Sequence, residues 1–240
     1  MLLYIPTKGD KIMKPIIGVV EWPYVDKDED VIFEVPTPIC NKIIEHGGIP
    51  VGLFPTISAD FQSREIPELE QSEIYDLHRI ISQCDAIIKP GAIRIYNYER
   101  LIYDYAVCQD MPFLGICAGM QLMAHYGKSK ISHNIRNTSN INHHQKETYA
   151  HEIFIEQGSL LSKVLDKPVV LVNSKHNYHI QDSGILKTSA HSFDGYIEAI
   201  ENPKCTFQLG VQWHPELIQD ENSDKLFDTF IESAKRYTLK

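Results

Sequence analysis

The chain has 240 residues, 43% of them hydrophobic, which is enough for one substantial α/β domain or two small ones. Its formal net charge of −9 argues against nucleic acid or an acidic membrane surface as a partner. It has no apolar run of the roughly 18 residues that span a bilayer and no basic, apolar leader, so we expect neither a transmembrane helix nor a signal peptide.

The cysteines indicate the compartment. There are five of them, none belongs to a C-x-x-C pair, and they are scattered at positions 40, 84, 108, 117 and 205. An odd, scattered set predicts free thiols in a reducing compartment, with the cytoplasm as the default, and no zinc site. The sequence therefore predicts a protein without a metal or a cofactor.

The first half of the chain alternates strands with helices. Residues 1–13 are expected to form an N-terminal extension and 14–240 a single domain, while both Met1 and Met13 remain open as the true start. Continuous apolar runs predict buried strands, and apolar spacings of three and four predict helices. The strands fall at 15–20, 49–54 and 85–92, the helices at 37–46, 74–82 and 95–109, and a solvated acidic loop at 26–30. The first two strands and the helix between them predict a right-handed βαβ unit.

An apolar run at 112–116 ends abruptly at Cys117 and continues into a helix-forming segment, so the cysteine lies at a bend. Gly115 and Gly119 flank it, which is the spacing of the G-x-S-x-G nucleophile elbow with cysteine in place of serine. The free amides and positive dipole end of the first helical turn favour a thiolate, and the amide of Ala118 is placed to bind an oxyanion. A structural, buried cysteine is the alternative.

Beyond Gly127 the chain becomes more polar and richer in β-structure. Residues 129–149 predict a long loop with one short strand. The paired His143 and His144 have no carboxylate or cysteine at a ligand-like spacing, so we expect this loop to border the active site without binding a metal. Further strands are predicted at 151–155, 169–172 and 207–213, a hairpin around 193–195, and a short helix opened by Ser159.

The last of these strands ends in His214-Pro215-Glu216. Proline cannot continue a strand ladder, so the chain leaves the sheet here and exposes the imidazole at the strand end. Glu216 is near enough in sequence to hydrogen-bond the ring and to stabilise its imidazolium form. With Cys117, these residues predict a nucleophile, a base and an orienting carboxylate. Taken alone, the His-Pro-Glu run also suits an ordinary surface turn.

The runs GICAGMQ at 115–121 and GVQWHPE at 210–216 resemble the class I glutamine amidotransferase superfamily. Shorter matches resemble one branch of it, the γ-glutamyl-γ-aminobutyrate hydrolases or peptidase C26 group; they lie at 16–19, 46–50, 90–91, 172–176 and 194–199. The resemblance implies an α/β three-layer sandwich of flavodoxin-like type. Its central sheet is mostly parallel, and its C-terminal half is rich in β-hairpins.

The resemblance also implies a reaction. Cys117 attacks a γ-glutamyl amide, His214 transfers the proton, and Glu216 orients His214, so that glutamate and a free amine leave by way of a thioester. The remaining implied site residues are Gly91, Ala92 and Ala118, whose backbone holds the oxyanion, and Gln121 and His176, which lie at the glutamyl pocket. The implied partner is a small γ-glutamyl molecule, with neither nucleic acid nor membrane involved.

Three departures from the branch concern the amine side of the substrate. Ala118 stands where the branch usually has arginine, Ala92 where it has a second glycine, and Asn177-Tyr178 where it often has His-Gln. Two alternatives follow: a glutaminase subunit that supplies ammonia to a separate synthetase partner, and a non-catalytic binding protein on the same fold. The sequence leaves the amine, the pathway and the oligomeric state open, with a homodimer among the arrangements.

Overall fold

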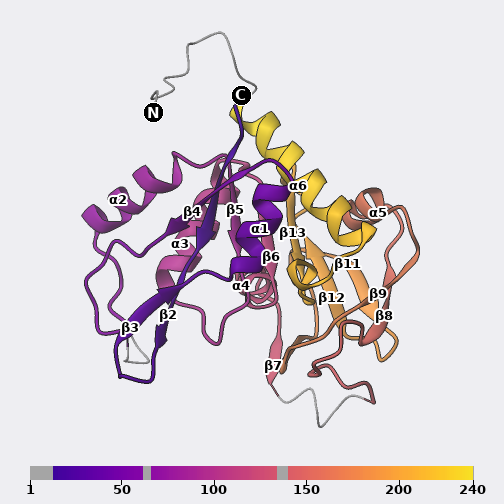
Figure 1. The fold of residues 1–240 in the computed structure, drawn as a ribbon. Helices are drawn as coiled ribbons and strands as arrows, with labels where there is room; N and C mark the ends of the chain where they lie inside the picture. Colours follow the sequence, from indigo (N-terminus) through magenta and orange to yellow (C-terminus); the bar gives the residue numbers. More distant parts are fainter. Residues whose placement is uncertain (1–12, 62–65, 134–139, 240) are drawn as a thin grey trace, which may run out of the picture.

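The computed structural model describes residues 13–61, 66–133 and 140–239 (Figure 1). In the first half, every predicted strand and helix is present near its predicted place, and two further strands precede the first helix. The elements are β1 (Ile16–Val20), β2 (Trp22–Val25), β3 (Val31–Glu34), α1 (Thr37–Glu45), β4 (Ile49–Leu53), α2 (Gln71–Ile81), β5 (Ala86–Lys89), α3 (Asn97–Cys108), β6 (Phe113–Ile116) and α4 (Ala118–Tyr126). β1 and β4 pair in parallel on either side of α1, which confirms the predicted βαβ arrangement of these elements. Apart from Met13, the expected extension at 1–13 lies outside the described residues.

The second half is richer in strands, as predicted. Its elements are β7 (Ile131–His133), β8 (His151–Ile155), α5 (Leu160–Leu165), β9 (Val169–Val172), β10 (Tyr178–Ile180), β11 (Lys187–Ser192), β12 (Ile197–Glu201), β13 (Gln208–Val211), a 3-10 turn (Pro215–Leu217) and α6 (Glu221–Thr238). The predicted hairpin is formed by β11 and β12. Ser159 caps α5 as predicted, since its hydroxyl accepts a hydrogen bond from the amide of Ser162 at 2.9 Å. Of the predicted loop 129–149, residues 134–139 lie outside the described part.

One sheet joins both halves of the chain. Its strand order is β4-β1-β5-β6-β13-β12-β11-β8-β9. From β4 to β13 neighbouring strands are parallel, whereas from β13 to β9 they are antiparallel. The α/β class and the central parallel sheet are therefore confirmed, and the antiparallel strands of the C-terminal half extend that sheet at one side.

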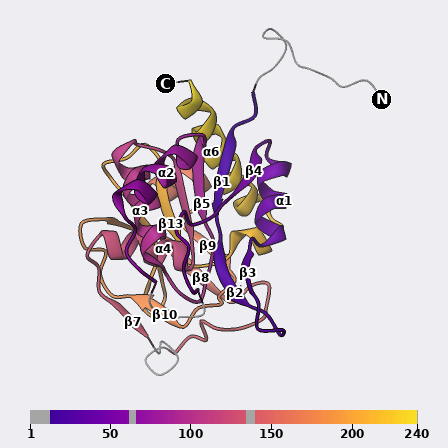
Figure 2. The ribbon, with the colours of Figure 1, turned by 90° about the vertical axis from the view of Figure 1, so that its left-hand side faces the viewer.

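Different helices cover the two faces of the central sheet. Successive residues of a strand point to opposite faces, so a strand buried on both sides needs apolar side chains throughout. In β5, Ala86 and Ile88 pack in one apolar cluster with α1, α5 and α6, and Ile87 packs in the other with α2, α3 and α4. Figure 2 shows α1 on one side of the parallel strands and α2, α3 and α4 on the other. All three side chains are fully buried. The predicted three-layer arrangement is thus confirmed.

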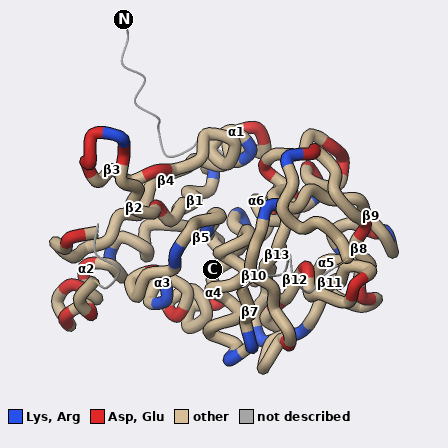
Figure 3. Tube along the Cα trace, turned by 90° about the horizontal axis from the view of Figure 1, so that it is seen from below, with Lys and Arg blue, Asp and Glu red and all other residues tan. Residues whose placement is uncertain are grey.

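A second, small sheet is not predicted by the sequence. β2 and β3 pair antiparallel, and the acidic residues 26–30 form the exposed turn between them, where charged residues cluster at the edge of the molecule (Figure 3). Pro23 has no backbone N–H to donate. It is tolerated within β2 because each strand of a two-stranded sheet has one edge that pairs with no other strand. Within the described residues, no helix combines the length and the apolar character needed to cross a bilayer.

Candidate active site

Cys117 lies at the turn between β6 and α4, where two glycines allow the backbone to pass. A Cβ atom on Gly115 would lie 2.6 Å from the backbone of Gly119, and one on Gly119 would lie 2.1 Å from the carbonyl oxygen of Lys89. Both distances are far below van der Waals contact, so neither position accepts a side chain without a shift of the backbone. The G-x-C-x-G spacing in the sequence is therefore a packing requirement of this turn.

The backbone of Cys117 is strained. Its φ of 52° and ψ of −103° lie in a region that residues other than glycine rarely adopt. Such a conformation costs on the order of 1–3 kcal/mol and persists only where the surroundings hold it. Here the Cys117 amide donates to the carbonyl of Val211 at 2.8 Å, and its carbonyl accepts from the amide of Gln121 at 3.1 Å. The turn thus fixes the thiol at the carboxyl end of β6.

His214 follows β13, which pairs in parallel with β6. The carboxyl ends of parallel neighbours meet at the same edge of a sheet, and here the side chains of Cys117 and His214 lie near each other, so that the thiol raises the pKa of His214. On its other side, the Nδ1–H of His214 donates to Oε1 of Glu216 at 2.7 Å. The structure therefore brings together the three residues that the sequence predicts as nucleophile, base and orienting carboxylate.

The surroundings of His214 favour its protonated form. Burial alone would lower the pKa of His214, but the interactions with the Cys117 thiol and the Glu216 carboxylate outweigh burial and raise the pKa to about 10. Glu216 is itself largely buried, which strengthens its interaction with the ring. A histidine of this kind is a strong acceptor for the proton of a neighbouring thiol.

Asn173 holds the backbone of His214 in place. Its side-chain amide donates to the carbonyl of His214 at 2.8 Å, and its Oδ1 accepts from the amide of His214 at 2.8 Å. Asn173 directly follows β9, at the far side of the antiparallel half. Sequence analysis gives this residue no role, because nothing in a local pattern shows that the ends of β9 and β13 meet.

The residues predicted for the oxyanion lie around the thiol. A Cβ atom on Gly91 would lie 2.7 Å from Cε1 of His214 and 3.4 Å from Cβ of Cys117, so the Gly91 backbone packs directly against both. Ala118 is the first residue of α4, and the first amides of a helix have no acceptor within it. Ala92 and Ala118 line the same cavity. Which of these amides binds an oxyanion remains a prediction.

A cavity of about 270 Å³ lies beside Ala118, and its lining includes Arg94, Arg100, Gln121 and His125. Gln121 is buried, and its amide donates to Oε1 of Gln212 at 3.4 Å. Two guanidinium groups at one cavity suit a carboxylate ligand. Gln121 therefore lies at a cavity next to the thiol, whereas the two arginines are not found from the sequence because they belong to no motif.

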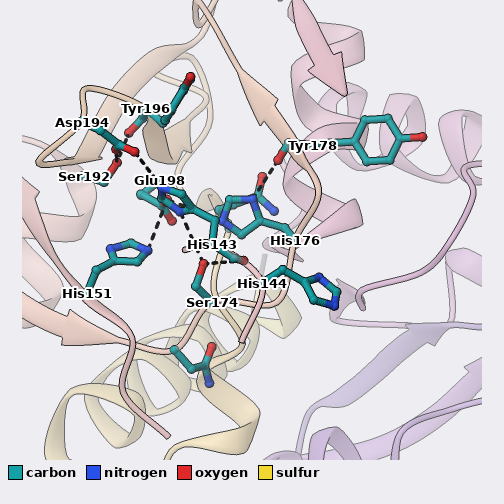
Figure 4. Close-up of polar contacts among 12 residues, drawn as sticks. His143, His144, His151, Ser174, His176, Tyr178, Ser192, Asp194, Tyr196 and Glu198 are labelled. Carbon is teal, nitrogen blue, oxygen red and sulfur yellow. Dashed lines mark hydrogen bonds and ion pairs between the residues drawn. The ribbon is translucent and has the colours of Figure 1, made fainter. Parts of the chain in front are cut away.

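His176 belongs to a separate buried group. Its Nδ1 donates to the carbonyl of Tyr178 at 2.8 Å, and its Nε2 lies 3.6 Å from Oε1 of Glu198. Figure 4 shows His143 and His151 beside the same carboxylate. The role of His176 at the glutamyl pocket remains a prediction. The sequence does not reveal the group itself, because its members come from four separate segments.

Comparisons with known proteins agree with these motifs. The model of the family described as peptidase C26 matches residues 93–216. A glutamine amidotransferase-like protein of Rickettsia prowazekii is 32% identical, with 92% of this chain and 98% of that protein covered. CTP synthase of Chlamydia trachomatis is 26% identical, with 84% of this chain and 44% of that enzyme covered.

Solved structures show the same fold. The glutaminase domain of Trypanosoma brucei CTPS, solved with bound acivicin, matches with a TM-score of 0.63 and covers 92% of this chain and 94% of its own. The sequence identity is 18%, so this likeness concerns the fold alone. It supports the predicted architecture of a central, mostly parallel sheet between layers of helices.

Proposed function

The chain belongs to the peptidase C26 family of glutamine amidotransferase-like enzymes, and from this premise we propose that it is a cysteine-dependent hydrolase of γ-glutamyl amides. It cleaves a γ-glutamyl amine, such as γ-glutamyl-γ-aminobutyrate, into glutamate and the free amine. The observation that supports this most strongly is the strained turn at Cys117, which places the thiol beside His214, whose ring is hydrogen-bonded to Glu216.

In the first half of the reaction, His214 first takes the thiol proton of Cys117, and Sγ then attacks the carbonyl carbon of the γ-amide. Negative charge develops on the carbonyl oxygen, where the backbone amides of Ala118 and of the turn at Gly91 stabilise it. His214 then gives its proton to the amine nitrogen as the carbon–nitrogen bond breaks. The amine leaves, and a γ-glutamyl thioester remains on Cys117.

In the second half, water attacks the thioester carbon while His214 takes a proton from it. The carbon–sulfur bond breaks, the proton returns to the sulfur, and glutamate leaves. Glu216 stays ionised throughout and stabilises the imidazolium at both stages. The raised pKa of His214 suits this role, because the residue holds the proton between its transfers.

The cavity beside Ala118 supports a substrate with an anionic head. Arg94 and Arg100 supply positive charge for the α-carboxylate of the glutamyl group, and Gln121 supplies hydrogen bonds near the thiol. The substrate is a small molecule. We place the reaction in the cytoplasm because all five cysteines are free, as a reducing compartment requires.

A second candidate is a glutaminase that supplies ammonia to a separate synthetase. The likeness to a part of CTP synthase that makes up less than half of that enzyme favours it. The two candidates differ in the leaving group, which is ammonia for the glutaminase and a larger amine for the hydrolase. The glutaminase candidate also predicts weak activity that rises when the synthetase partner is present.

The experiment is a substrate panel on the purified full chain: γ-glutamyl-γ-aminobutyrate, other γ-glutamyl amines, polyglutamates and free glutamine. We expect the γ-glutamyl amines to be cleaved with a higher kcat/KM than glutamine. Cys117→Ala should lower kcat by roughly 10⁴-fold or more, because nucleophile and base act as a unit. Mass spectrometry of rapidly quenched wild-type protein should show the added γ-glutamyl group on Cys117.

Cys108→Ala is the matched control, since Cys108 is exposed at the end of α3 and should leave activity unchanged. Circular dichroism checks that both variants keep the fold. Hydrolysis that survives Cys117→Ala would overturn the mechanism. Cleavage of glutamine alone, with no amine substrate accepted, would favour the glutaminase.

A further inference from the structure

Four buried side chains from separate segments converge on one point in the C-terminal half (Figure 4). They are His143 from the loop before β8, His151 at the start of β8, His176 before β10 and Glu198 on β12. Their exposed fractions are 1%, 7%, 3% and 0%. The proposed hydrolysis uses the side chains of Cys117, His214 and Glu216, and it assigns no step to this group.

Each histidine turns one ring nitrogen toward the same oxygen of Glu198. Oε1 lies 3.3 Å from Nδ1 of His143, 3.6 Å from Nε2 of His176 and 3.8 Å from Nε2 of His151. Two ligands bonded to one tetrahedral zinc at about 2.0–2.1 Å are themselves about 3.3–3.4 Å apart. The separation from His143 equals that within a ligand shell, and the separation from His151 exceeds it by a few tenths of an ångström.

The outer nitrogens determine where the ring protons lie. Nδ1 of His151 and Nδ1 of His176 face the backbone carbonyls of Glu152 and Tyr178, at 3.1 and 2.8 Å, and a carbonyl can only accept. Nε2 of His143 faces the carboxylate of Asp194 at 3.0 Å. His151 and His176 therefore donate outward and can turn a lone pair inward, as metal-binding histidines do. Nδ1 of His143 lies 3.4 Å from Oγ of Ser174, whose own proton goes to the carbonyl of His143 at 2.9 Å.

The inward-facing atoms lack donors. Among the described residues, Nε2 of His151, Nε2 of His176 and both carboxylate oxygens of Glu198 find no hydrogen-bond partner. Burying an ionised carboxylate beside lone pairs is costly unless a positive charge compensates it. A proton shared by His143 and Glu198 would satisfy that pair with one hydrogen bond. The rings of His151 and His176 would still face Glu198 without a donor. A cation between His143, His151 and Glu198 would compensate the carboxylate and accept the lone pairs of both rings.

We propose that this cluster binds zinc through His143, His151 and Glu198, whose ligand atoms all lie within 4.8 Å of one another. Two imidazoles and a carboxylate form a mixed nitrogen and oxygen set that suits zinc. His176 contacts Glu198 but does not lie within that distance of all three groups, so it borders the site and is not a ligand. The ion joins three separate segments of the chain, and a water molecule completes its coordination.

The experiment uses the full chain and Zn²⁺ alone. Protein produced in zinc-supplemented medium is dialysed, and its zinc is counted by plasma mass spectrometry. We expect one zinc per chain in the wild type and at least a tenfold loss in Glu198→Gln and in His151→Gln. His191→Gln is the matched control and should keep its zinc, because His191 pairs with Glu156 outside the cluster.

Binding of Co²⁺ to the wild-type protein tests the proposal even if a ligand variant fails to fold. Wild-type protein is stripped with a chelator and titrated with Co²⁺, whose visible absorption is strong in a tetrahedral site. We expect the absorption to saturate at one Co²⁺ per chain and to disappear when Zn²⁺ is added. A wild type that takes up neither ion stoichiometrically overturns the proposal, and so does a folded Glu198→Gln variant that keeps its full zinc.

Discussion

Cys117 combines a thiol side chain with a backbone conformation that only glycine adopts readily. The positive φ orients the thiol between the end of β6 and the start of α4, and the packing of Gly115 and Gly119 leaves the turn no other path. The residue therefore stabilises the protein less than another amino acid could. Sites that hold a strained nucleophile commonly trade stability for activity in this way.

Two variants that lack the thiol distinguish the effect of the backbone strain at position 117 on stability from the loss of the catalytic side chain. Cys117→Gly removes both the thiol and the penalty of the positive φ, whereas Cys117→Ala removes only the thiol. We expect Cys117→Gly to be more stable than Cys117→Ala by about 1 kcal/mol, although glycine loses more entropy on folding elsewhere. Urea denaturation of the two variants measures the difference. An alanine variant as stable as the glycine variant, or more so, would mean that the turn is relaxed.

The pKa of His214 makes the stability of the protein depend on pH. It is raised from 6.5 to about 10 by Cys117 and Glu216, which outweigh burial. Between these values the unfolded chain loses the proton and the folded chain keeps it, so the free energy of unfolding falls as the pH rises. The stabilisation is complete below pH 6.5 and is lost as the pH passes through about 10.

The difference in unfolding free energy between wild type and His214→Gln isolates this contribution. We expect the difference to be largest near pH 6 and to shrink steadily toward pH 10, as measured by urea denaturation across that range. A difference that stays constant, or that grows with pH, would show that His214 gains no proton affinity on folding.

At the scale of elements, β5 and α3 are joined by an ion pair inside the core. Nζ of Lys89 lies 2.9 Å from Oε1 of Glu99, and both side chains are fully buried. Glu99 also accepts a hydrogen bond from the amide of Tyr96 at the start of α3. Lys89 ends the strand that leads into Gly91, so the pair fixes α3 relative to the turn against the thiol.

Replacement of Lys89 alone should strongly destabilise the protein. Lys89→Met leaves the Glu99 carboxylate buried without a cation, and we expect the free energy of unfolding to fall by about 3–5 kcal/mol. Glu99→Gln added to Lys89→Met should recover most of the loss. Arg79→Met is the control, because Arg79 pairs with Asp76 on the surface and should change stability by about 0.5 kcal/mol or less. Equal effects of Lys89→Met and Arg79→Met in urea denaturation would contradict the account.

Most helices and strands can be predicted from the sequence, but the contacts between them cannot. Apolar runs and helical spacing give β1, α1, β4 and β6 close to their observed bounds, because burial on both faces leaves a strong local signal. β2 and β3 are missed because Pro23 and the neighbouring charged residues obscure the pattern of a strand. Lys89 is missed because a single charge in an apolar run gives no sign that Glu99 will meet it.

At the scale of the molecule, the site depends on the pairing of two halves. The Cys117 turn belongs to the parallel half, while Asn173 comes from the antiparallel half and His214 from the strand where the two meet. Two motifs suffice to predict that Cys117, His214 and Glu216 come together. The two hydrogen bonds between Asn173 and the backbone of His214, and the histidine cluster around Glu198, depend on the strand order within the antiparallel half. No local sequence pattern encodes that order.

The register of β6 against β13 has a consequence for how the protein becomes functional. Gly115 lies opposite Gly210 and Ile116 opposite Val211, so this one ladder sets the distance between sulfur and imidazole. A slip of two residues would separate them by roughly a further 6–7 Å. The ladder joins distant parts of the chain, and such long-range contacts close late and slowly. In a refolding chain, catalytic activity should therefore return only when β6 pairs with β13. A chain that has already formed most of its helices and strands stays inactive until that pairing is complete.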